Sequence, residues 1–368
     1  MASLFHPLCG GTPPTLWQLF TDAGGIAPQR LPQAALALAL ALARWPFSRW
    51  EGRLTAQVLD APMPPPIFIV GYWRSGTTHL HNLLSQSPAF GYITPLATGL
   101  PWDILGLVGT LEPWLEKALP RDRYVDQVAV TPTAPQEDAI PLATMGAASY
   151  YHGLYFPQRF RHHFNRGVFF AGDDGTAVAQ WQDCQRLLLH KVSIQQQGKP
   201  LLVKNPVYTA QVARLCQLWP GAKFIHIYRN PYVVFPSSRH FFLRLLPELA
   251  LQTYDPATLT TEVEDLILTS YPPMMAALEA DRTTLPAHDF AEIRFEALEQ
   301  DPLSTLEQLY TTLDLGDFAP VRPALATYLE GLQGYRKNRY DLAPELLDRV
   351  EAHWGSWIRR WGYERPGA

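Results

Sequence analysis

The segment at residues 66–84, PIFIVGYWRSGTTHLHNLL, constrains the fold more than any other part of the chain. An apolar run passes through a turn that contains Gly71 and Gly76 and then becomes a helical pattern. The first N–H groups of a helix have no partner within it, and together with the helix dipole they favour an anion. The sequence therefore predicts a strand, a phosphate-binding loop and a helix. The N–H donors are expected on four residues: Ser75, Gly76, Thr77 and Thr78.

The spacing of the two glycines matches the phosphate loop of nucleoside triphosphatases, but the residues between and after them do not. Thr77 stands where those enzymes place the lysine that bridges the outer phosphates. The cation of this loop is Arg74 instead. The loop is therefore expected to hold a terminal phosphate of a ligand other than ATP.

A second segment, residues 222–242, indicates a second anion site. Its apolar strand at 224–228 ends in Arg229, and a helix with Ser237 and Ser238 in its early turns follows. A magnesium-dependent nucleotide site would have an Asp at the end of this strand. A guanidinium instead binds a phosphate directly through paired hydrogen bonds. The segment predicts a second phosphate contact that needs no metal.

These two segments resemble the sulfotransferases that use 3′-phosphoadenosine 5′-phosphosulfate (PAPS). In that family a loop of the form RSGTT, here residues 74–78, binds the 5′-phosphosulfate. An Arg-Asn-Pro element with a serine eight residues after the arginine binds the 3′-phosphate, and Arg229 and Ser237 keep that spacing. A late Arg-Lys-Gly element is similar to Arg336 and Lys337 here, although asparagine replaces the glycine.

The resemblance extends over most of the chain from about Arg44 onward and is closest to a bacterial branch of the family. It implies that the chain transfers a sulfuryl group from PAPS to a hydroxyl, or to an amine, by in-line displacement. Arg74 would hold the phosphosulfate. Lys204, in the stretch LLVKNP, would neutralise the charge that grows on the bridging oxygen as its bond to sulfur breaks.

The catalytic base is less well defined. Sulfotransferases that act on phenols and steroids have a histidine two residues after the lysine, where this chain has Pro206. Glu137 and Asp138 lie in an otherwise apolar stretch, and an apolar cleft raises the pKa of a carboxyl group toward the range that suits a base. Glu137 is the first candidate, with Asp138 or a histidine as alternatives. An acidic pair that caps a helix would look the same.

Strands and helices alternate along the chain, which predicts an α/β fold with a P-loop-like parallel sheet flanked by helices. Ligands bind beyond the carboxyl ends of such strands, where Gly71, Lys204 and Arg229 are expected. Residues 95–130 are predicted to form a helical and loop lid over the substrate cleft. We expect residues 1–60 to be an N-terminal helical extension and residues 61–368 to be the catalytic domain.

Residues 34–43, AALALALALA, form the most apolar run before that domain. The run is shorter than the approximately twenty residues that span a bilayer, and no basic segment precedes it as in a signal peptide. It predicts a helix buried in the core or, alternatively, in contact with a membrane or a partner. The aromatic residues Trp45, Phe47 and Trp50 that follow are compatible with a membrane surface.

Composition supports an enzyme of a reducing compartment, with a cytoplasmic or peripheral membrane location expected. The formal net charge is −4 with scattered basic residues, which argues against nucleic acid as a partner. The three cysteines, Cys9, Cys184 and Cys216, have neither metal-ligand nor disulfide-framework spacing, so no metal is expected. The expected acceptor is a small molecule, a glycan or a lipid. The alternatives are a P-loop kinase and a nucleotide-binding scaffold without catalysis.

Overall fold

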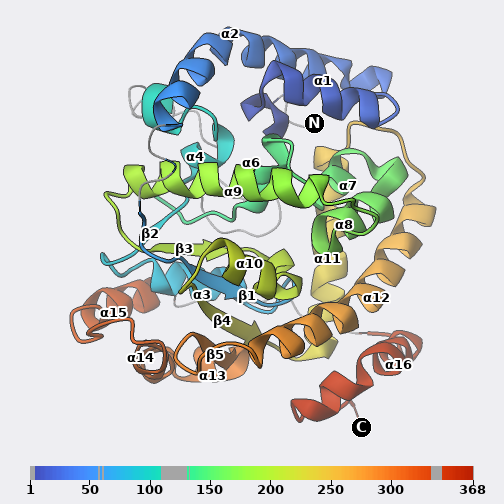
Figure 1. Cartoon of the computed structure of the whole chain (residues 1–368). Helices are drawn as coiled ribbons and strands as arrows, with labels where there is room; N and C mark the ends of the chain where they lie inside the picture. Colours follow the sequence, from blue (N-terminus) through green and yellow to red (C-terminus); the bar gives the residue numbers. More distant parts are fainter. Residues whose placement is uncertain are drawn as a thin grey trace. The chain divides into compact units, whose positions relative to one another are not determined.

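The computed structural model describes residues 5–56, 59, 62–108, 131, 133–332 and 342–367 (Figure 1). The chain forms two compact units, each assembled from three segments. The helical unit consists of Met1–Pro64, Gly91–Leu201 and Phe242–Leu259, and the sheet unit consists of Pro65–Phe90, Leu202–Phe241 and Thr260–Ala368. The division expected near residue 60 stays a prediction.

A five-stranded sheet in the order β2-β3-β1-β4-β5 organises the fold. The pairs β1–β3, β1–β4 and β4–β5 are parallel, as the alternation of strands and helices predicted. Strands β1 and β3 are buried along their whole length, which explains why both read as continuous apolar runs in the sequence. The strands are β1 (Ile67–Val70), β2 (Gly91–Tyr92), β3 (Leu201–Lys204), β4 (Lys223–Tyr228) and β5 (Phe290–Arg294).

Apolar side chains cover one face of the sheet in the sheet unit. Ile69 of β1 and Ile225 of β4 belong to a buried cluster with Leu80 and with Leu306 from two helices. On the other face, the ring of Phe68 stacks on Phe224 at 5.5 Å. Burial on both faces holds the strand ends, and therefore the loops that follow them, in fixed positions.

In the sheet unit, α13 and α14 lie next to β5 (Figure 1). Asp301 caps α14 by accepting a hydrogen bond from the Ser304 N–H at 3.1 Å, and Pro302 follows at the first position of the helix. The elements are α3 (Thr77–Leu84), η6 (Pro206–Ala210), α10 (Val212–Leu218), α11 (Pro231–Leu249), α12 (Pro256–Arg282), α13 (Phe295–Gln300), α14 (Pro302–Thr312), α15 (Arg322–Gly331) and α16 (Pro344–Arg360). The last residues of α11 and the first of α12 belong to the helical unit.

Tryptophans anchor the last helix, α16. Trp354 is fully buried and its ring stacks on Tyr271 at 4.0 Å. The Trp354 indole N–H donates to the Leu268 carbonyl at 2.9 Å. Trp361, just after the helix, stacks on Tyr228 at the end of β4 at 4.7 Å. These residues pack the chain terminus against the sheet unit.

The helical unit contains the N-terminal helices and most of the middle of the chain. Its long helix α9 lies beside α6 and η3 (Figure 1). Residues 95–108 of the predicted lid form two short helices, and residues 109–130 lie outside the described residues. The elements are η1 (Pro7–Gly10), α1 (Pro13–Asp22), η2 (Pro28–Arg30), α2 (Leu31–Thr55), α4 (Pro95–Gly99), η3 (Ile104–Val108), α6 (Ala139–Thr144), α7 (Tyr151–Tyr155), η5 (Pro157–Arg159), α8 (Phe160–Phe169) and α9 (Thr176–Gln195).

The apolar run at residues 34–43 is helical, as predicted, and forms part of α2. Ala34, Ala37 and Ala41 are buried, whereas Leu42 is 56% exposed. The run is therefore buried along one face of the helix and not on all sides.

Candidate functional site

The loop after β1 depends on glycine at position 71. Gly71 has a φ of 147°, and a Cβ there would lie 2.3 Å from the carbonyl oxygen of Ile227. The Gly71 N–H donates to the Thr209 hydroxyl at 2.8 Å. A residue with a side chain would collide with the Ile227 carbonyl, because the backbones after β1 and within β4 lie too close together. The chain therefore turns away from the sheet at a glycine.

The second glycine of the loop is required for a different reason. Gly76 has a φ of 101°, and a Cβ there would lie 2.2 Å from the ring of Phe295. Arg74 also adopts a left-handed conformation, with a φ of 69°. Such backbone in a non-glycine residue costs about 1 kcal/mol or more and concentrates at functional sites.

The helix that follows the loop presents N–H groups at its start. The first hydrogen bond inside α3 runs from the Leu80 N–H to the Gly76 carbonyl at 3.1 Å. The N–H groups of Gly76, Thr77 and Thr78 precede this bond and are not used by the helix. The Ser75 N–H instead donates to the Tyr72 carbonyl at 3.1 Å, which closes the turn. Three of the four expected donors therefore lie at the helix start, and the fourth shapes the loop.

Arg229 directly follows β4 and lies against the loop. Its guanidinium packs over the Phe295 ring at 4.2 Å and donates to the Arg74 carbonyl at 3.4 Å. The side chain is half-buried. The same Phe295 ring thus excludes a side chain at position 76 and packs against Arg229. The two segments that are predicted to bind anions therefore both contact Phe295.

The serines of α11 join the two segments directly. The Ser237 hydroxyl accepts a hydrogen bond from Arg74 Nε at 3.1 Å. The Ser238 hydroxyl donates to the Trp73 carbonyl at 3.0 Å. Both serines are buried. The helix start is set by Asn230, whose side-chain oxygen accepts from the Tyr232 N–H at 3.0 Å.

Lys204 ends β3, the strand on the other side of β1. Its position in the sheet is opposite Ile69, one residue before the end of β1. Its side chain is buried, with the residue only 5% exposed. The next residue, Asn205, caps the short helix η6 by accepting from the Val207 N–H at 3.1 Å. Because the strands are parallel, Gly71, Lys204 and Arg229 all lie at the same edge of the sheet, as predicted.

Glu137 and Asp138 lie in the helical unit, just before α6. The hydroxyls of Tyr151 and Tyr150 both donate to Glu137 Oε1, at 3.2 and 3.4 Å. Burial raises the pKa of Tyr151 well above its usual value, and the neighbouring Tyr150 and Glu137 raise it further, so this phenol stays protonated and donates. Asp138 is fully buried at the N-cap of α6 without a side-chain capping bond.

Two predicted residues cannot be located, because Arg336 and Lys337 lie outside the described residues.

Four residues that the sequence did not indicate contribute to the geometry of the site segments. Thr209 and Phe295 follow strands at positions with no recognisable motif, and the two tyrosines that hold Glu137 belong to an aromatic stretch without a motif of its own. The four residues are Thr209, Phe295, Tyr150 and Tyr151.

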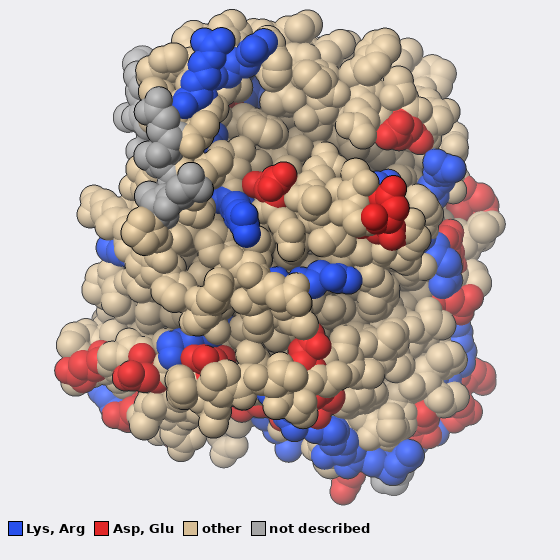
Figure 2. Space-filling view, viewed as in Figure 1, with Lys and Arg blue, Asp and Glu red and all other residues tan. Residues whose placement is uncertain are grey.

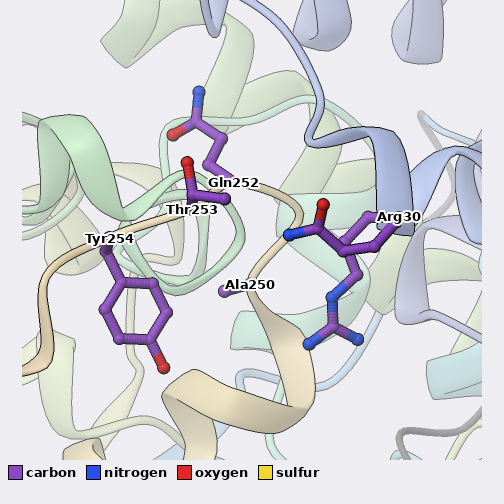
Figure 3. Close-up of a pocket in the computed structure, with 6 residues that line it drawn as sticks. Arg30, Ala250, Gln252, Thr253 and Tyr254 are labelled. Atoms are coloured by element: carbon purple, nitrogen blue, oxygen red, sulfur yellow. The ribbon is translucent and has the colours of Figure 1, made fainter.

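A pocket of about 410 Å³ lies in the helical unit, and none of its lining residues is a predicted site residue (Figure 3). The Arg30 guanidinium donates to the Pro247 carbonyl at 2.8 Å, and the Gln252 side chain donates to the Ala23 carbonyl at 2.8 Å. These polar groups join the segments around α1 and η2 to the connection between α11 and α12. The pocket is lined by Gln29, Arg30, Ala250, Gln252, Thr253 and Tyr254.

Two kinds of feature are absent from the described part of the chain. No set of three or more His, Cys, Asp or Glu side chains there is arranged to hold a metal ion. No helix among the described ranges is long and apolar enough to cross a bilayer.

Known proteins resemble this chain in both sequence and fold. Residues 65–320 match the model of the sulfotransferase family. Omega-hydroxy-beta-dihydromenaquinone-9 sulfotransferase Stf3 of Mycobacterium bovis is 33% identical over 318 residues, which cover 85% of this chain and 79% of that protein. The crystal structure of sulfotransferase STF9 from Mycobacterium avium has a TM-score of 0.72 at 17% identity and covers 98% of both chains. The crystal structure of sulfotransferase STF1 from Mycobacterium tuberculosis H37Rv has a TM-score of 0.66 at 19% identity. The match covers 93% of this chain and 90% of the STF1 chain. The chain therefore belongs to the sulfotransferase family.

Proposed function

We propose that this sulfotransferase uses PAPS as its donor and binds both ends of the nucleotide in the sheet unit. The hydrogen bond between Arg74 and Ser237 carries the proposal, because it joins the loop expected at the 5′-phosphosulfate to the helix expected at the 3′-phosphate. The N–H groups at the start of α3 would bind the phosphosulfate oxygens. The Arg229 guanidinium would bind the 3′-phosphate.

Lys204 is proposed to stabilise the leaving group. In the in-line reaction the acceptor oxygen forms a bond to sulfur while the bond from sulfur to the bridging oxygen breaks, and the electron pair stays on that oxygen. An ammonium group at the end of β3 would stabilise this charge more in the transition state than in the ground state. The buried position of Lys204 fits this role, because a low dielectric strengthens the interaction.

Glu137 is proposed as the base that takes the proton of the acceptor hydroxyl. The two tyrosine hydroxyls on Oε1 restrict the rotation of the carboxylate. A carboxylate held in one orientation meets the geometric requirement for proton transfer better than a rotating one.

The acceptor is proposed to be a hydroxyl group on a lipid. The support is the similarity to the Mycobacterium relative, whose name specifies an omega-hydroxylated menaquinone derivative.

The test is incubation of the protein with PAPS labelled at sulfur and a panel of acceptors. The panel contains long-chain isoprenoid alcohols, short alcohols, phenols, amines and carbohydrates. The proposal predicts labelled sulfate ester on an isoprenoid alcohol and release of adenosine 3′,5′-bisphosphate in equal amount. Lys204→Met is expected to lower kcat about 100-fold or more with little change in donor affinity. Labelling of carbohydrates alone would contradict the lipid acceptor, and the absence of transfer to every class would contradict the catalytic proposal.

A further inference from the structure

Helix α2 has its polar and apolar residues on the opposite faces from those of an ordinary surface helix. The residues that face the interior recur at helical spacing and include five polar or charged side chains. They are Gln33, Arg44, Ser48, Glu51 and Thr55. The face that points to solvent contains the large apolar side chains Phe47, Trp50 and Leu54, which are 54%, 55% and 48% exposed. An amphipathic helix that packs on a core has the reverse pattern.

The buried polar face is fixed by partners within the helical unit. Glu51 pairs with Lys191 at 2.8 Å and accepts a hydrogen bond from the Gly106 N–H at 2.7 Å. Arg44 forms an ion pair with Asp103, and the Ser48 hydroxyl donates to Asp103 Oδ1 at 2.6 Å. Turning the helix would leave Lys191 and Asp103 buried without their partners, at a cost of several kcal/mol. The apolar face is therefore held outward by the structure of the unit.

The outward face combines apolar and cationic groups. Phe47, Trp50 and Leu54 are spaced by three and four residues and so form one stripe. Arg49 and Arg53 are exposed beside it. Glu51 is the only acidic residue of the helix, and it is only 2% exposed, so the solvent face of α2 has no carboxylate of its own. Figure 2 shows basic side chains among uncharged surface where α2 lies in Figure 1.

Other large apolar side chains of α2 and α1 are also exposed. Leu42 and Leu31 of α2 are 56% and 53% exposed. Trp17 lies on α1, which packs against α2, and is 71% exposed. Clustered exposure of large apolar side chains on a folded unit marks an interaction surface. Trp and Phe with adjacent Arg are the residues that bind the boundary between lipid headgroups and acyl chains.

We propose that the solvent face of α2 (Phe47, Arg49, Trp50, Arg53 and Leu54) docks the protein on an anionic phospholipid bilayer. The aromatic and leucine side chains would enter the headgroup boundary, and the two arginines would bind lipid phosphates. The charge of the face favours this occupant, because a surface with exposed guanidinium groups and no exposed carboxylate complements an anionic membrane. Two copies of the same cationic face would repel each other. The inference does not depend on the proposed donor or acceptor.

The test is flotation of the full chain with vesicles in the absence of PAPS and acceptor. One set of vesicles contains phosphatidylcholine only, and the other also contains phosphatidylglycerol. We expect the wild-type protein to float with the anionic vesicles and to be released by high salt. The triple variant Phe47→Ser, Trp50→Ser, Leu54→Ser should lower the partition coefficient by at least about tenfold. The double variant Arg49→Gln, Arg53→Gln should lower it about tenfold on anionic vesicles only.

Matched controls separate this face from general surface effects. Ile194→Ser removes an apolar side chain that is 46% exposed on α9, and Arg322→Gln with Arg360→Gln removes two exposed arginines of the sheet unit. Both controls should float like the wild type, and all variants should keep the thermal unfolding midpoint.

Wild-type protein that stays unbound to anionic vesicles would overturn the proposal, as would flotation unchanged in the triple variant. A dimer that the triple variant dissociates, without any vesicle binding, would assign the face to a second copy and also overturn it. Sulfuryl transfer to a soluble acceptor should be unaffected by the triple variant, so failure here is distinct from failure of the proposed function.

Discussion

The guanidinium of Arg74 donates a hydrogen bond from Nε to the hydroxyl of Ser237 at 3.1 Å, across 163 positions of sequence. Arg74 belongs to the loop between β1 and α3, and Ser237 belongs to the helix that follows β4. The bond therefore joins the two segments that are proposed to bind the anionic ends of the donor. A ligand with two separate anionic groups would find both contacts already in place.

Arg229→Ala tests the second contact. The loss of a charge-assisted hydrogen bond to phosphate is expected to weaken binding of adenosine 3′,5′-bisphosphate about 10- to 100-fold. Titration calorimetry measures the effect. Arg322→Ala is the control, because Arg322 forms an exposed ion pair with Glu307 in the same unit and its loss should change affinity very little. Equal affinity in the Arg229 and Arg322 variants would argue against the phosphate contact.

Gly76→Ala tests the packing of the loop on Phe295. The substitution combines a positive φ with a Cβ that would lie 2.2 Å from the Phe295 ring, so the loop must move. We expect loss of donor binding and a lower free energy of unfolding. Gly316→Ala is the matched control, since Gly316 has a φ of 91° but open space around it. The control should cost about 1 kcal/mol of stability and leave donor affinity unchanged. Intact donor binding in Gly76→Ala would contradict this account of the loop.

Glu137→Gln and Tyr151→Phe test the proposed base and its support. The first should lower kcat about 100-fold or more with little change in KM for PAPS, because proton transfer is lost. Tyr151→Phe removes one of the two phenols on Oε1 and is expected to lower kcat by a smaller factor, about tenfold. Steady-state kinetics at several pH values distinguish the two roles, since the Glu137 variant should also lose the acidic limb of the kcat profile. A Glu137→Gln enzyme with wild-type kcat would exclude Glu137 as the base.

Part of the fold and of the site could be predicted from the sequence. The strands before Gly71 and Arg229 are short apolar runs followed by turn or helix signals, and parallel strands place their ends at one edge. The contact between Arg74 and Ser237 was not predictable, because it depends on how α11 packs against the loop. The role of Phe295 has no sequence signal either, since a phenylalanine after a strand is most often only a core residue.

The N-terminal helix shows a different limit of sequence analysis. The Ala-Leu run predicted a helix correctly, but not which face is buried. That face is set by charged partners more than 50 residues away, such as Asp103 for Arg44 and Lys191 for Glu51. Because these pairs form only in the folded unit, hydrophobic periodicity alone pointed to a more complete burial.

The stability of the protein is expected to fall in mild acid because of buried histidines. Burial lowers the pKa of His152 from its usual 6.5 to about 4, against a hydrogen bond to the Ala143 carbonyl that raises it. The unfolded chain therefore binds a proton first as the pH falls. The stabilisation is complete above about pH 6.5 and is lost progressively toward pH 4. His163, with a pKa lowered by burial to about 3, adds to the same trend.

Denaturant unfolding across this pH range measures the effect. Between about pH 4 and 6.5, unfolding of the wild type takes up as much as one proton at His152. His152→Gln should therefore reduce the slope of the unfolding free energy against pH by up to about 1.4 kcal/mol per pH unit. His353→Gln, at an exposed position of α16, is the control for the substitution of a histidine by glutamine. A slope in the His152 variant equal to that of the wild type would show that His152 is not held neutral by burial.

We propose that one nucleotide is bound at both anionic ends, by the loop at 74–78 and by Arg229, without a metal. The decisive experiment is titration calorimetry of adenosine 3′,5′-bisphosphate, with EDTA and then with magnesium in the buffer. We expect one binding site per chain, the same affinity in both buffers, and at least tenfold weaker binding in Arg229→Ala. Absence of binding in EDTA, or an affinity that requires magnesium, would contradict it.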